Sequence, residues 1–132
     1  MSHGRFLPPD HARGDENTVG GYAAVHSRAA ALEGKDGLSY SLELLTDDTG
    51  DPARPFGAYL VFLQWRRIGE QGIDGHLETD FIAYAQTAPE ALALAGATPL
   101  TACQRLLDAL VAARDGESGR RWFDVMRDED GP

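Results

Sequence analysis

The sequence predicts an α+β domain in which an antiparallel sheet of about four strands carries two C-terminal helices on one face. Two observations lead to this class. In the central part of the chain, segment 38–45 alternates apolar and polar residues with a period of two, as antiparallel strands do, and segments 56–67 and 75–86 have the pattern of a long hairpin. The C-terminal part instead carries helix-capping residues and an apolar stripe at helical spacing.

The composition is typical of one domain that folds without a disulfide or a structural metal ion. The chain has 132 residues, of which 42% are hydrophobic, and domains of this length bury roughly two-thirds of their unfolded surface. The one cysteine, Cys103, cannot form an internal disulfide, which is typical of a reducing compartment. No segment approaches the roughly 18 consecutive apolar residues of a membrane span, and residues 1–9 lack the apolar core of a secretory signal. We therefore expect a cytoplasmic protein.

The charge of the chain argues against two classes of partner. The formal net charge is −9 and the sequence pI is about 4.7, so phosphate backbones and anionic membranes repel the chain at long range. We therefore expect neither a nucleic acid nor a membrane as partner. Only Lys35 among the 12 basic residues is a lysine, and with abundant Ala, Gly, Asp and Arg this composition is typical of bacteria with GC-rich genomes.

The two ends of the chain are expected to lie outside the folded unit. Residues 1–20 hold few apolar groups, so their burial cannot offset the entropy of ordering, and we expect a flexible N-terminal arm. Residues 127–132 are acidic and are expected to form a frayed tail. The predicted domain is therefore residues 21–126.

The first elements of that domain follow from local patterns. The Ala-rich residues 21–33 are expected to form a strand, and Asp36-Gly37 then favours a tight turn because glycine tolerates a positive φ. Residues 38–45 alternate cleanly and predict a strand with one apolar face, made of Leu38, Tyr40, Leu42 and Leu44. Residues 46–55 are acidic and contain Gly and Pro, which predicts a loop.

Capping residues predict where the two helices begin. Thr87 and Glu90 form a capping-box pair, so a helix should start at Ala88, and Gly96 suits the left-handed position just past its end. Thr98, followed by Pro99, predicts the start of a second helix.

The second helix carries an apolar stripe that is expected to face the core, made of Leu100, Cys103, Leu107 and Leu110. Gly116 is expected to end this helix. Residues 120–126 are apolar enough to pack back on the domain, as a strand or as a helix.

Segments 56–67 and 75–86 are expected to pair as a long hairpin. If residues of like parity share a face, the odd residues meet the helices, and the even residues form a second face that is charged near the loop and apolar away from it. The apolar half is Phe56, Leu60, Phe62, Ile82 and Tyr84. Exposed apolar patches of this kind usually mark contact surfaces. The N-terminal strand or the C-terminal Trp122-Phe123 segment, a second copy of the chain or a ligand would cover it, and we predict a homodimer through this patch.

The charged half of the same face is the candidate for chemistry. His76, Glu78 and Asp80 are spaced i, i+2, i+4, so their side chains share one face of a strand. An imidazole and two carboxylates suit a divalent metal or acid–base catalysis, with Arg66 orienting an anion. The alternative is an ordinary solvated strand face, in which Glu78 pairs with Arg66. A further alternative is a small-ligand site between the sheet and the helices, lined by Tyr59, Trp65 and Tyr84.

The remaining candidate residues have structural explanations. His26 is expected to be a structurally satisfied histidine and Cys103 a core residue. The acidic loop with Asp47, Asp48 and Asp51 lacks the ligand spacing of a calcium loop. The sequence indicates no cofactor. The predicted function is protein association without catalysis, with an enzyme or metal-binding protein and a ligand-binding module as alternatives.

Overall fold

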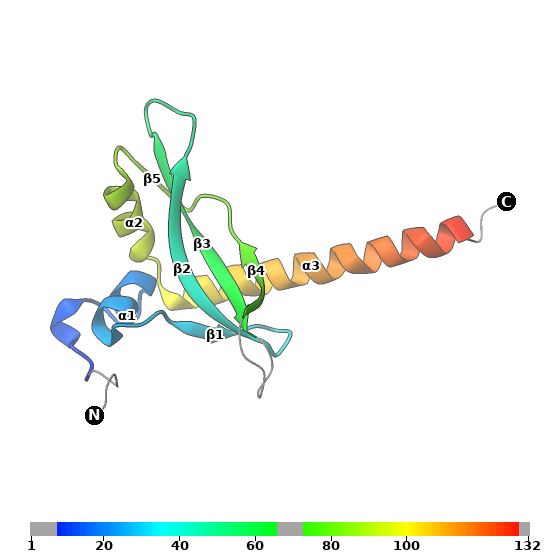
Figure 1. The fold of residues 1–132 in the computed structure, drawn as a ribbon, viewed down its shortest axis with the longest axis horizontal. Helices are drawn as coiled ribbons and strands as arrows, with labels where there is room; N and C mark the ends of the chain where they lie inside the picture. Colours follow the sequence, from blue (N-terminus) through cyan, green and yellow to red (C-terminus); the bar gives the residue numbers. More distant parts are fainter. Residues whose placement is uncertain (1–7, 66–72, 130–132) are drawn as a thin grey trace.

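A computed structural model describes residues 8–65 and 73–129, and confirms the predicted α+β class (Figure 1). Five strands in the described residues form one antiparallel sheet, with helices against one of its faces. The elements in chain order are η1 (His11–Arg13), α1 (Val19–His26), β1 (Ala31–Glu33), β2 (Ser39–Asp48), β3 (Phe56–Trp65), β4 (Ile73–Glu78), β5 (Ala83–Ala85), α2 (Ala88–Gly96) and α3 (Leu100–Glu129).

β3 is the central strand of the sheet. Its residues 56–64 pair with β2, and β1 lies beyond β2. On its other edge, β4 pairs with the end of β3 and β5 with its beginning. The second strand of the predicted hairpin is therefore interrupted: four residues, 79–82, face only two residues of β3, 59 and 60, so two residues are extra. Such an insertion releases the chain locally from the ladder.

The predicted turn between the first two strands is confirmed. Gly37 has a φ of 78°, and the Gly34 amide donates to the Leu38 carbonyl across the turn. After it, β2 follows the predicted alternation, with Tyr40 and Leu42 buried on one face. That face packs on the helices.

The core lies between the sheet and the helices. Leu60 and Phe62 of β3 are fully buried with Leu107 of α3, in a cluster that also holds Val19, Tyr40, Leu42, Cys103 and Val111. A second cluster joins Ala58 of β3 to Ala91 and Ala95 of α2. Three alanines at this contact let the α2 backbone approach the sheet closely.

The predicted facing of the hairpin is wrong. Phe62 lies opposite Leu77 and Leu63 lies opposite His76, so residues of unlike parity share a face. A register shift of one residue moves every side chain of one strand to the other face. The even residues of β3 therefore face the helices, and the odd residues lie on the face that no described helix covers. We call this second face the open face.

The N-terminal part of the domain is helical where a strand was expected. Thr18 caps α1, because its Oγ1 accepts from the Gly21 amide, and the helix ends at Ser27, whose φ is 54°. Only Ala31–Glu33 of the expected strand pairs with β2. Val19 is buried and its amide donates to the Thr98 carbonyl, so packing begins before residue 21.

The capping box is confirmed, but Gly96 does not take the predicted left-handed position. Thr87 Oγ1 accepts from the Glu90 amide, and α2 starts at Ala88 as predicted. Gly96 is the last residue of α2 and has no positive φ. Instead, α1 and α2 touch here, because a Cβ on Gly20 would lie 2.9 Å from the Gly96 Cα. This close approach explains the glycine at position 20, whereas a Cβ on Gly96 would make only ordinary contacts, the nearest at 3.5 Å.

α3 begins at Leu100, close to the predicted start, and continues through Gly116 to Glu129. One glycine costs a helix interior only about 1 kcal/mol relative to alanine, so it is not a stop signal by itself. Residues 120–126 are therefore helical, and Figure 1 shows the helix running past the edge of the sheet. Within the described residues, no helix combines the length and apolarity needed to cross a lipid bilayer.

Candidate functional site

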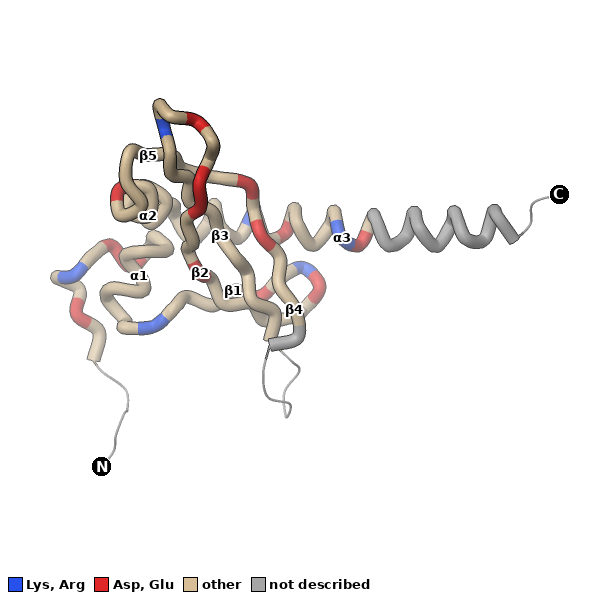
Figure 2. The backbone as a smooth tube through the Cα atoms, turned by 45° about the horizontal axis from the view of Figure 1, so that its top comes forward, with Lys and Arg blue, Asp and Glu red and all other residues tan. Residues whose placement is uncertain are grey.

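The open face of the sheet is strongly acidic. By the pairing register it carries the carboxylates of Glu33, Glu43, Asp47 and Glu78. None of the five described strands contains a lysine or an arginine. Figure 2 shows this arrangement, with acidic positions along β2 and β4 and no basic position on a described strand. The side chains of the strands therefore give this face a negative potential, and Arg54 of the loop between β2 and β3 adds one positive charge over the Tyr84 ring.

Apolar groups are exposed beside these carboxylates. Leu45, Trp65 and Tyr84 retain 42%, 41% and 37% of their accessible surface. Trp65 is held in place by a hydrogen bond of 2.9 Å from its Nε1 to Ser41 Oγ. An acidic face with exposed, fixed apolar side chains has the composition of a recognition surface.

The row predicted to carry chemistry lies on this face but does not converge. His76 Nε2 is 3.9 Å from Glu78 Oε2, and both side chains are more than half exposed. Asp80 lies beyond the end of β4, in the interrupted segment. Arg66 lies outside the described residues. Among the residues that the structure describes, no group of three His, Cys, Asp or Glu side chains is placed to hold a metal ion.

The interruption between β4 and β5 forms a cleft of about 300 Å³ in the open face. Its aromatic lining is Tyr59, Phe81 and Tyr84, and its acidic lining is Asp47, Glu78 and Asp80. Thr79 holds the interrupted backbone, because its amide donates to the Leu60 carbonyl and its Oγ1 accepts from the Leu60 amide. These two hydrogen bonds attach the segment that lines the cleft to β3.

The residues predicted to form the dimer patch are separated by the observed register. Leu60 and Phe62 are fully buried against the helices, and Ile82 packs against the same core. Phe56 packs at the α2 contact. Tyr84 alone lies on the open face, opposite Gly57. Helices of the same chain therefore cover most of this patch. Trp122 and Phe123, one of the expected covers, have side chains outside the described part.

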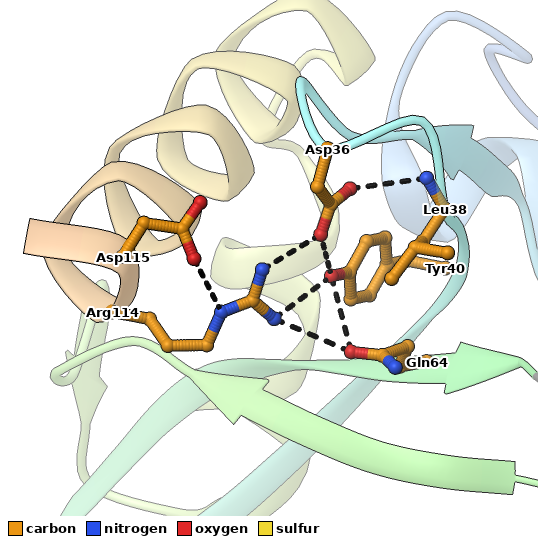
Figure 3. A network of polar contacts seen from close by, with 6 residues as sticks. All are labelled: Asp36, Leu38, Tyr40, Gln64, Arg114 and Asp115. Atoms are coloured by element: carbon orange, nitrogen blue, oxygen red, sulfur yellow. Dashed lines mark hydrogen bonds and ion pairs between the residues drawn. The ribbon is translucent and has the colours of Figure 1, made fainter. Parts of the chain in front are cut away.

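A second group of polar side chains joins α3 to the sheet (Figure 3). Arg114 Nη2 donates to Asp36 Oδ2 over 2.8 Å, and Nη1 donates to Tyr40 Oη and Gln64 Oε1. The Tyr40 hydroxyl donates to Asp36 Oδ2 over 2.6 Å. The second Asp36 oxygen accepts from the Leu38 amide. These groups satisfy one another, which is typical of a structural network.

The pKa values in this network have clear causes. Burial alone would raise the pKa of the Asp36 carboxyl, but hydrogen bonds from Tyr40 and Arg114 outweigh it and hold that pKa below its ordinary value. Burial, followed by the hydrogen bond to Asp36, raises the pKa of Tyr40. The hydrogen bond to Asp36 is the main reason that the pKa of Arg114 is raised. The ion pair is therefore formed at neutral pH.

His26 has the partner expected of a structural histidine. Its Nε2 is 3.0 Å from Glu16 Oε2, and its ring stacks on Tyr22 with centroids 4.3 Å apart. His11 Nδ1 is 3.7 Å from the other Glu16 oxygen. Glu16 thus ties the segment before α1 to the end of that helix.

Cys103 is expected to be unreactive in the folded protein. The side chain is fully buried, and burial raises the pKa of its thiol to about 11. An unfolded cysteine has a pKa of about 8.5, so at about pH 8 its thiolate fraction is about a hundredfold larger. Alkylation should therefore be at least about a hundredfold faster in urea than in buffer, as followed by mass spectrometry. Rapid alkylation of the folded protein would contradict this placement.

The comparisons with known proteins give no guide to this site. No family model matches the chain, and neither a curated protein nor a solved structure is significantly similar to it.

Proposed function

We propose that this domain acts without chemistry of its own, by binding a positively charged protein surface on the open face of its sheet. One observation carries the proposal. Carboxylates and exposed apolar side chains share the one sheet face that no described helix covers, and the described strands offer no basic residue to neutralise them. Complementary charge steers association, and exposed apolar groups such as Trp65 supply contact area.

The same charges argue against a second copy of the chain as the occupant. A dimer that packs open face on open face brings the carboxylates of Glu43, Asp47 and Glu78 near those of the other copy. Like charges placed opposite each other oppose association. The predicted homodimer stays a prediction, and its contact would have to differ from the patch around Phe62. A cationic partner fits the open face better.

Catalysis is the less favoured account because the groups suited to acid–base chemistry on this face are solvated. His76 and Glu78 are more than half exposed. An exposed pair of this kind lacks the fixed, water-excluded geometry on which electrostatic catalysis depends.

To test the proposal, the isotope-labelled protein is titrated with a short peptide of arginine and leucine residues, and its amide NMR signals are monitored during the titration. We expect the signals of Leu45 and Trp65 to shift, with smaller changes at higher salt. A peptide with glutamate in place of each arginine should leave them unmoved. Trp65→Ala should weaken binding by about tenfold, or about 1.4 kcal/mol.

Leu94→Ala is the matched control for this titration, because Leu94 is 58% exposed but lies on α2, away from the open face. It should bind the arginine peptide as the unmodified domain does. Equal shifts with both peptides, or none with either, would contradict the proposal. A dimeric mass that Trp65→Ala abolishes would place a second copy on this face instead.

A further inference from the structure

The cleft at the interruption between β4 and β5 is built by an aromatic cluster. Phe81 lies on the backbone of Gly57, where a Cβ would come within 2.4 Å of its ring. Its ring meets Tyr59 edge-on at 6.0 Å and Tyr84 at 5.7 Å between centroids. Only a glycine at position 57 leaves room for this ring. The three rings therefore form one fixed cluster on the open face.

Three carboxylates lie beside this cluster in the cleft. Asp47, Glu78 and Asp80 line the same cleft, and no lysine or arginine is among its described lining residues. Asp47 and Tyr84 lie on either side of Gly57 by the strand register, so the Phe81 ring lies between a carboxylate and a second aromatic ring. Aromatic faces and carboxylates both attract a cation, and a partly enclosed site strengthens that attraction.

The protein already places one guanidinium group on this cluster. Arg54 lies over the Tyr84 ring, with its Cζ 4.2 Å from the centroid. Arg54 belongs to the loop between β2 and β3, where Thr49 Oγ1 donates to its carbonyl and its Nε forms an ion pair with Asp51 Oδ2 at 3.6 Å. Arg54 is not among the residues that line the cleft. The contact between Arg54 and Tyr84 shows that a guanidinium group suits this cluster. Because Arg54 does not line the cleft, the cleft can receive a second cation.

We infer that this cleft binds the guanidinium group of an arginine side chain from a partner protein. The planar, weakly hydrated guanidinium stacks on aromatic rings and also donates two parallel hydrogen bonds to one carboxylate, which a compact ammonium does not. Phe81 offers the stacking surface beside Tyr84, whose ring already carries Arg54 on one face, and Asp47, Glu78 and Asp80 offer the carboxylates. The inference rests on the proposed function and names the group by which that partner is recognised.

The test uses N-acetyl-arginine methylamide as the probe and its citrulline counterpart as the neutral control of the same shape. The arginine probe should shift the ring signals of Phe81 and Tyr84 with a dissociation constant in the millimolar range, and the citrulline probe should leave them in place. Asp80→Asn should weaken binding of the arginine probe by about threefold or more, since a carboxylate close to the cation is lost. Phe81→Leu, which keeps apolar bulk but removes the ring, should abolish the response at Tyr84.

Glu33→Gln is the matched control, because it removes one carboxylate from the same open face at the distant strand β1. Its effect should be clearly smaller than that of Asp80→Asn, and amide spectra should show each variant folded. Equal weakening by both variants, or equal shifts with the citrulline probe, would overturn the inference.

The two proposals fail in different ways. A response of the cleft to the arginine probe, without any effect of Trp65→Ala on peptide binding, supports the cleft and refutes the wider binding face. Peptide binding that depends on Trp65 but not on Asp80 or Phe81 supports the face and refutes the cleft.

Discussion

Replacing Phe62 by alanine should lower the free energy of unfolding by about 3–5 kcal/mol. Phe62 is fully buried, lies between Leu42 of β2 and Leu77 of β4, and packs in the cluster with Leu107 of α3. Removal of its ring leaves a cavity that strands paired on both sides cannot fill by moving together. Urea unfolding, followed by circular dichroism, measures the loss. Domains of this kind are stable by about 5–15 kcal/mol, so the variant should be close to its limit of stability.

Two further variants, one at Phe62 and one at Leu45, distinguish a core position from an exposed one. Phe62→Glu should fail to fold, because a carboxylate would be buried without a partner. Leu45→Ala removes an apolar side chain that is 42% exposed on the open face, and it should cost less than about 1 kcal/mol. If Phe62→Glu instead gives a folded monomer while the unmodified protein is a dimer, then Phe62 lies in an interface and the β3–β4 register is wrong.

The wrong facing of the hairpin shows what local patterns leave undetermined. β3 is apolar on both faces: Tyr59, Val61 and Leu63 are as apolar as Leu60 and Phe62. When both faces of a strand are apolar, alternation does not say which one meets the helices. The choice depends on register, and register depends on the loop and on long-range packing. β2 has no such ambiguity, because Ser39, Ser41 and Glu43 mark its open side, and its facing was predicted correctly.

Predictions that depend only on neighbouring residues are confirmed at the start of α2 and at the first turn. The hydroxyl of Thr87 and the turn at Gly37 act within a few residues, and both are as predicted. Thr18 capped a helix by the same mechanism, but the Ala- and Gly-rich sequence after it gave no apolar stripe to support a helix. The predicted helix end at Gly116 is wrong, because the cost of one glycine is too small to end α3 there.

The cleft was not predicted, although the sequence contains a trace of it. Along 75–86 the even residues change from charged to apolar between Asp80 and Ile82. Such a change within one face is what an interruption of the strand produces. The two extra residues carry Phe81 out of the ladder and onto Gly57, and that placement depends on a contact between positions 24 residues apart, since 81 − 57 = 24. Alternation alone cannot supply a contact of this range.

Replacing Arg114 by methionine should destabilise the domain by about 2 kcal/mol at neutral pH. Methionine keeps the apolar stem, but Asp36 loses its ion pair, and Tyr40 and Gln64 lose a donor. Breaking a buried ion pair costs about 3–5 kcal/mol. The Arg114 side chain is 34% exposed, whereas that of Asp36 is 12% exposed, so solvent screening reduces this figure.

The pH dependence identifies the ion pair as the cause. The pKa of Asp36 is lower in the folded protein than in the unfolded chain, so its stabilising effect is present above the unfolded pKa and is lost as the pH falls through the folded pKa. The difference between Arg114→Met and the unmodified protein should therefore shrink in acid. At alkaline pH, Tyr40 should act in the opposite sense. Its raised pKa means that its contribution is complete below the unfolded pKa and is lost as the pH rises through the folded value.

Arg105→Met is the matched control for this experiment, since it removes the same charge from an exposed position of the same helix. It should change the free energy of unfolding by no more than about 0.5 kcal/mol. If the two substitutions cost the same, or if the Arg114→Met difference does not change between neutral and acid pH, the network of Figure 3 does not fix α3 to the sheet. If the difference shrinks in acid for Arg114→Met alone, the Asp36–Arg114 ion pair is what joins this part of α3 to the turn between β1 and β2.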